Sequence, residues 1–161
     1  MIQSRERLIP KVIEETIEKS NFDLSKSDFL WFSVPFSQKF PAQFIQNKFL
    51  RTPLVYIFET SAECLKVGKG SGIYRINQHY KNKPTFTSTL CRSIMLPASE
   101  EFRLENGIKN DEQSVADWIL NSTKKYLIFM IGNQLPSQKK RMVSYIEMDL
   151  ALQLSPRYED G

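Results

Sequence analysis

The chain has 161 residues, of which 41% are hydrophobic and 25% charged, and its formal net charge is +4. This length fits one domain with a decorated core, and the composition is that of an ordinary globular protein. No apolar run is long enough to span a membrane, and the N-terminus lacks the apolar core of a signal peptide. We therefore expect a cytoplasmic protein with no membrane partner.

The reactive side chains are few. Cys64 and Cys91 are the only cysteines, no Cys-x-x-Cys spacing occurs, and the chain has one histidine. A zinc site needs more soft ligands than these, so both cysteines are expected to be reduced and structural. The mildly basic charge is compatible with a phosphate-bearing partner but does not require one.

The first fifty residues are expected to form a helical and aromatic extension that packs on the core. Residues 5 to 19 carry apolar side chains at helical spacing, and Pro10 suggests that this helix starts near Leu8. Residues 21 to 50 are dense in aromatic side chains, and residues 42 to 50 could form a short helix. These rings either fill a core between the helix and a sheet or stack on nucleic-acid bases.

A β-hairpin is predicted next. Residues 54 to 58 have the pattern of a strand, residues 60 to 63 that of a turn, and residues 64 to 67 that of a second strand. Glycines at positions 68, 70 and 72 are expected to break the second strand. A helix is predicted to follow at about residues 74 to 81.

The second half of the chain alternates helical and strand patterns. The predicted elements are a possible helix at 87–95, a strand or loop at 100–110, a helix at 111–121, a buried strand at 126–131 and a helix from 139 or 140 to 154. Asp111 is a candidate N-cap, and the last helix should stop before Pro156. The fold class is therefore predicted to be α+β, with a small, mainly antiparallel sheet flanked by helices.

Several side chains could together carry hydrolytic chemistry. Tyr56 and Lys66 lie on the two strands of the hairpin, Arg75 and His79 are four residues apart on the following helix, and Glu147 lies far downstream. Phosphodiester hydrolysis needs such an inventory. A carboxylate can hold Mg²⁺, an arginine can clamp the phosphate oxygens, and a phenol or an amine can activate water.

The order and spacing of these residues resemble the GIY-YIG nuclease family. Leu54-Val55-Tyr56 stands for the family's Gly-Ile-Tyr strand, and Lys66-Val67-Gly68-Lys69 stands for its Tyr-Ile-Gly-Lys strand. Arg75 to His79 matches the family's arginine helix. Glu147 matches the metal-binding glutamate, because Pro156 follows it nine residues later, as in the family's closing turn.

This chain departs from the family pattern at three positions. The first motif lacks its glycine, the second-motif tyrosine is Lys66, and the closing asparagine is Glu159. Some restriction endonucleases of the family carry lysine at the second position, close to the attacking water. The literal string Gly72-Ile73-Tyr74 comes after the second motif, and we interpret it as a coincidence.

The resemblance implies a Mg²⁺- or Mn²⁺-dependent endonuclease that cuts double-stranded DNA by a one-metal mechanism. Glu147 would hold the metal, Tyr56 with Lys66 and His79 would activate the water, and Arg75 would stabilise the charge on the phosphate. The side chains expected to contact phosphate or DNA are Lys69, Tyr74, Lys81 and Lys83.

The resemblance also divides the chain. Residues 51 to 161 would form the GIY-YIG-like nuclease domain, with an insertion around residues 82 to 125, and residues 1 to 50 would be the extension. Lys66 favours a type II restriction endonuclease, and a homodimer would cut both strands of a symmetric site. Two alternatives remain: a GIY-YIG-like module that binds nucleic acid without cutting, and an unrelated α/β protein in which Tyr56 and Glu147 lie far apart.

Overall fold

The computed structural model describes residues 5–20, 22, 28–38, 51–72 and 88–158. Within these ranges an antiparallel sheet is flanked by helices, which confirms the predicted α+β fold class. The sheet has the order β1-β4-β2-β3. Its strands are β1 (Phe29–Val34), β2 (Leu54–Glu59), β3 (Cys64–Gly70) and β4 (Lys124–Met130). The helices are α1 (Arg5–Lys19), α4 (Thr89–Met95), α5 (Glu100–Glu105), α6 (Glu112–Ser122), α7 (Pro136–Leu154) and the short 3₁₀ helix η4 (Pro97–Ser99).

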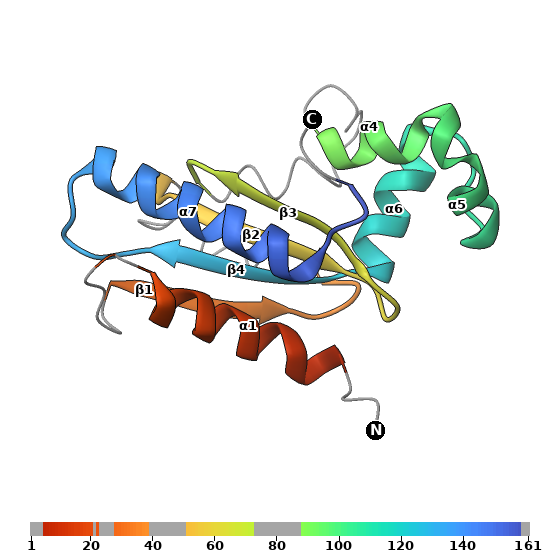
Figure 1. Ribbon diagram of the computed structural model, residues 1–161. Helices are drawn as coiled ribbons and strands as arrows, with labels where there is room; N and C mark the ends of the chain where they lie inside the picture. The colour runs from red at the N-terminus through yellow and green to blue at the C-terminus, as the bar shows by residue number, and fades with distance from the viewer. Residues whose placement is uncertain (1–4, 21, 23–27, 39–50, 73–87, 159–161) are drawn as a thin grey trace.

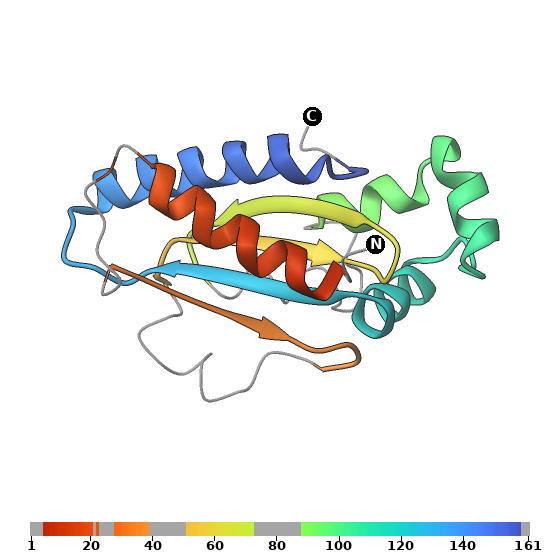
Figure 2. The same ribbon diagram turned by 60° about the horizontal axis from the view of Figure 1, so that its bottom comes forward.

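One face of the sheet is covered by α1 and α7, which lie side by side (Figures 1 and 2). The predicted apolar stripe of α1 is buried there, except for Leu8, which is 39% exposed. The predicted start near Leu8 is wrong, because α1 begins at Arg5 and contains Pro10. Burial of the stripe against the sheet and α7 outweighs the one backbone hydrogen bond that Pro10 cannot donate.

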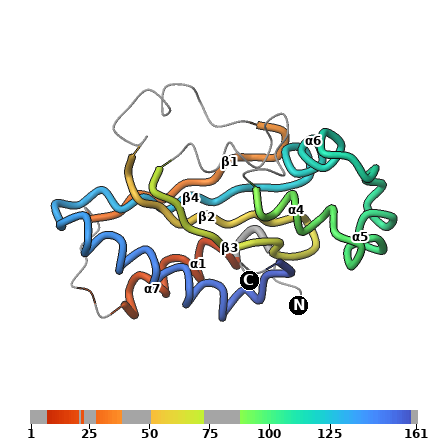
Figure 3. The backbone as a smooth tube through the Cα atoms, turned by 90° about the horizontal axis from the view of Figure 1, so that it is seen from above, coloured from red at the N-terminus to blue at the C-terminus, as the bar shows by residue number. Residues whose placement is uncertain are grey.

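The opposite face packs against α4 and α6, and Figure 3 shows α6 across the strands from α1 and α7. Tyr56 and Phe58 of β2 point to this side and join a core with residues from both helices. The residues of α4 and α6 buried in this core are Leu90, Cys91, Ile94, Val115 and Ile119. No helix in the described part of the chain is long and apolar enough to cross a membrane.

The edge strand β1 was not predicted. Phe29–Val34 pairs antiparallel with β4, and the ring of Phe32 stacks on that of Phe129 at 5.8 Å between centroids. Phe22 also packs against the core beside α7. Phe22, Phe29 and Trp31 thus pack on the core between α1 and the sheet, as one of the two interpretations expected. Phe32 packs on the opposite face, and Phe36 is 42% exposed. The predicted helix at 42–50 lies outside the described residues.

The β2–β3 hairpin is confirmed, but the prediction that glycines break its second strand is wrong. β3 continues to Gly70, and Gly68 stays in register opposite Tyr56. The missing side chain of Gly68 makes room for the tyrosine ring, since a Cβ there would lie 2.4 Å from the Cζ atom of Tyr56. The predicted helix at 74–81 lies outside the described residues.

The later elements follow the sequence prediction except at α5 and at the starts of β4 and α7. The predicted strand or loop at 100–110 begins with the helix Glu100–Glu105, which Gly107 ends at a φ of 65°. Asp111 is the expected N-cap and its Oδ1 accepts from the backbone N–H of Ser114 at 2.8 Å. The helix α7 starts earlier than expected, because Pro136 is tolerated in the first turn.

Candidate active site

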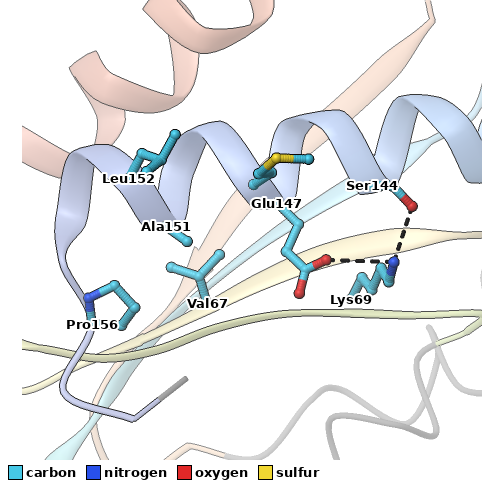
Figure 4. Close-up of a pocket in the computed structure, with 8 residues that line it drawn as sticks. Val67, Lys69, Ser144, Glu147, Ala151, Leu152 and Pro156 are labelled. Atoms are coloured by element: carbon cyan, nitrogen blue, oxygen red, sulfur yellow. Dashed lines mark hydrogen bonds and ion pairs between the residues drawn. The ribbon is translucent and has the colours of Figure 1, made fainter. Parts of the chain in front are cut away.

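The helix α7 crosses β3 and brings Glu147 next to a lysine of the second motif. The Nζ atom of Lys69 lies 3.6 Å from Oε2 of Glu147 and donates to Oγ of Ser144 at 3.0 Å (Figure 4). Ser144 and Glu147 are three residues apart, so they share one face of α7. Two predicted site residues from distant parts of the chain therefore meet over the edge strand of the sheet.

This polar cluster opens into a hollow of about 390 Å³ between α7 and β3. Figure 4 shows the carboxylate of Glu147 reaching from the helix towards the strand, with Val67 facing Ala151 beside it. The remaining wall is apolar, with Met148 and Leu152 more than half exposed at the rim. The carboxylate of Glu147 and the ammonium group of Lys69 thus lie at the opening of a hollow whose other walls are mostly apolar.

Tyr56 lies on the other face of the sheet. Its side chain is fully buried, and its ring packs over Gly68 and edge-to-face on Phe58, with centroids 5.6 Å apart. Side chains alternate between faces along a strand, so Gly68 belongs to the face of Tyr56, whereas Lys69 belongs to the face of α7. The structure therefore does not bring Tyr56 and Glu147 into one hollow.

Lys66 shares the face of Tyr56. It pairs with Phe58 across the hairpin, it is 1% exposed, and its Nζ donates to Oγ1 of Thr89. Thr89 begins α4, whose N-terminus is capped by the Ser88 hydroxyl accepting from a backbone N–H at 3.0 Å. The described site residues are thus divided between the two faces of the sheet. Tyr56 and Lys66 lie on one face, and Lys69 and Glu147 lie on the other.

Five predicted site residues lie outside the described residues: Tyr74, Arg75, His79, Lys81 and Lys83. Sequence reasoning missed Ser144, which holds the ammonium group of Lys69. The signal for it was present, since a hydroxyl three residues before Glu147 on a helix must share its face.

The donor set around Glu147 fits a metal ion that keeps most of its water. The described residues contain no group of three or more His, Cys, Asp or Glu side chains that could hold a metal. Mg²⁺ is commonly held by one or two carboxylates together with substrate phosphates and water, so Glu147 could hold such an ion only together with a phosphate. The ammonium group of Lys69 would have to turn from Glu147 towards an anion when a cation binds.

A second buried lysine, Lys125, flanks Phe58 on the side opposite to Lys66. Lys125 of β4 pairs with Phe58 from the other side, is 1% exposed, and donates from Nζ to the carbonyl of Leu120 at 2.9 Å. Burial lowers the pKa of Lys125 from 10.5 to about 8. The thiols of Cys64 and Cys91 are buried too, and burial raises the pKa of Cys91 to about 12, so it is unreactive.

The lowered pKa of Lys125 predicts a pH-dependent stability. Above about pH 8 the folded protein has lost this proton, whereas the unfolded chain keeps it until about pH 10.5. Stability therefore rises with pH through this window. Relative to the variant Lys125→Met, the wild type should gain up to about 3 kcal/mol of unfolding free energy between pH 8 and 10.5. Urea unfolding of both proteins across this range checks it, and a constant difference would contradict it.

Comparison with protein-family models, with curated proteins and with solved structures gives no match for this chain.

Proposed function

We propose that this protein is a Mg²⁺-dependent endonuclease of the GIY-YIG type that hydrolyses phosphodiester bonds of double-stranded DNA by a one-metal mechanism. One observation carries the proposal: Lys69 of the second motif lies 3.6 Å from Glu147, at an open hollow. The motif spacing and this contact are independent of each other. A chance match in the sequence would not require the downstream glutamate to lie against the second motif.

In this proposal Glu147 holds the ion and Lys69 binds a phosphate oxygen. Bound Mg²⁺ would supply Lewis-acid stabilisation of the phosphate and lower the pKa of water. The half-exposed side chain of Lys69 can turn from Glu147 to an anion at little cost, because exposed ion pairs are weak. Tyr56 and Lys66 were predicted to activate the water with His79, but both are buried on the face of the sheet opposite to Glu147, so water activation at this ion is assigned to His79. Charge stabilisation is assigned to Arg75, and further phosphate contacts to Tyr74, Lys81 and Lys83.

Tyr56 and Lys66 share the face of the sheet that lies opposite to Glu147. Both side chains point away from α7 and are buried, and Nζ of Lys66 donates to Oγ1 of Thr89. Lys66 also favours a restriction-type enzyme in the cytoplasm, in which a homodimer would cut both strands.

Incubation with supercoiled plasmid tests the activity. We expect nicked and linear DNA in the presence of Mg²⁺ or Mn²⁺, no cleavage in EDTA, and recovery when Mg²⁺ is added back in excess. Sequencing of the ends then gives the cleavage position. Cleavage that persists in EDTA would overturn the metal-dependent mechanism.

A second candidate function is a module that binds nucleic acid without cutting it. The placement of Tyr56 and Lys66 favours this candidate, because these predicted water-activating residues lie buried on the face of the sheet opposite to Glu147. The same plasmid separates the two functions. A gel shift without nicking, in either Mg²⁺ or Mn²⁺, would support binding alone.

A further inference from the structure

A second hollow, of about 370 Å³, adjoins the one that contains Glu147. The two hollows share Lys69 and Ser144 as walls, so together they form one groove along α7 and β3. The second hollow is completed by Lys140 and Val143 of α7 and by Pro53, Gly70 and Ser71 around the strand ends.

The charge of this second hollow is entirely positive. Two lysines and two hydroxyls line it, and none of its lining residues is acidic. Lys69 is partly neutralised by Glu147 at 3.6 Å, but Lys140 is exposed and forms no ion pair or hydrogen bond in the described part of the chain. Lys140 therefore adds a positive charge to the hollow, beside the hydroxyls of Ser71 and Ser144.

The helix sets the distance between this charge and the carboxylate. Lys140, Ser144 and Glu147 follow the spacing i, i+4, i+7, so they share the face of α7 that covers β3. Seven residues of helix separate Lys140 from Glu147 by about 10 Å along the axis. An extended strand of nucleic acid lying in the groove would present one phosphate near Glu147 and a later one near Lys140.

We propose that the hollow formed by Lys69, Ser71, Lys140 and Ser144 binds a second backbone phosphate, further along the strand that has one phosphate at Glu147. The ligand is a phosphodiester group of a nucleic acid. The choice of substrate rests on the proposed function, but the binding of this phosphate does not require cleavage.

The test measures binding separately from cutting. Fluorescence anisotropy of a labelled DNA duplex in EDTA, repeated over a range of salt, compares the wild type with Lys140→Gln and the matched control Lys139→Gln. Lys139 is the sequence neighbour of Lys140 and does not line the hollow. Lys140→Gln should weaken binding roughly fivefold and reduce the salt slope by about one, whereas Lys139→Gln should leave the slope unchanged.

Neutral methylphosphonate linkages, placed one at a time along one strand, identify the contact. In the wild type one linkage should weaken binding, and in Lys140→Gln that same linkage should cost nothing, because the charge that it faced is gone. Inorganic phosphate is added as a competitor. If it displaces DNA from the wild type and Lys140→Gln equally, the hollow recognises the strand and not a free phosphate ion. Stronger competition against the wild type, with no methylphosphonate-sensitive linkage, assigns the hollow to free phosphate and overturns the proposal.

Failure of this proposal differs from failure of the nuclease function. Equal effects of Lys140→Gln and Lys139→Gln, or no methylphosphonate-sensitive position, would overturn the second phosphate site even if plasmid is cut. Selective loss in Lys140→Gln without any cleavage would support the site and overturn the nuclease. A wild type that does not bind DNA would overturn both.

Discussion

The variant Glu147→Gln should lose DNA cleavage by about a thousandfold or more, which is the scale of losing a main charge-stabilising group. The amide keeps the shape of the side chain but removes the negative charge that would hold the ion. Stability should change little, since the pair with Lys69 is partly exposed and such pairs contribute about 1 kcal/mol or less. Initial rates of plasmid nicking in Mg²⁺, with thermal unfolding in parallel, measure both effects.

Asp149→Asn provides the matched control for this prediction. Asp149 lies two residues further along α7, accepts a hydrogen bond from Gln153 at 2.7 Å, and lines neither hollow. Removing its charge should leave the nicking rate unchanged. Wild-type cleavage by Glu147→Gln, or an equal loss in both variants, would show that Glu147 does not hold the catalytic ion.

The elements that could be predicted are those whose pattern is local. The β2–β3 hairpin has a turn between two apolar runs, and α6 starts at an N-cap, so sequence spacing alone locates both. β1 could not be predicted in this way, because its pairing with β4 joins residues almost a hundred positions apart. The helix Glu100–Glu105 is only six residues long and offers too little periodicity to recognise.

The candidate site was predictable as a set of residues but not as an arrangement. The motif spacing identified both Lys69 and Glu147, yet only the crossing of α7 over β3 puts them in contact. Strand alternation already separates Lys66 from Lys69, since the two lysines are three positions apart and an odd offset puts them on opposite faces of the strand. The groove from Glu147 to Lys140 depends on the rotation of α7 against the sheet, which no sequence spacing specifies.

The contact between Tyr56 and Gly68 predicts the largest effect on stability. In Gly68→Ala the new Cβ would lie 2.4 Å from Cζ and 2.5 Å from the hydroxyl oxygen of Tyr56, closer than any two such atoms approach. The ring is fully buried and packed on Phe58, so it cannot move aside freely. We expect a loss of about 3 kcal/mol of unfolding free energy, at the upper end of overpacking costs, measured by urea denaturation.

A double-mutant cycle separates the clash from the loss of glycine itself. Tyr56→Leu removes the ring, so adding Gly68→Ala in that background should cost at least about 1 kcal/mol less than in the wild type. Gly107→Ala is the control, because no atom lies within 4 Å of its new Cβ and only its φ of 65° opposes the change. Its cost of about 1 kcal/mol should not depend on residue 56. Additive effects of Gly68→Ala and Tyr56→Leu would mean that the glycine is not there to seat the tyrosine. If the two substitutions are coupled as expected, and Gly68→Ala also loses nicking well below its unfolding temperature, the position of the Tyr56 ring matters for the reaction.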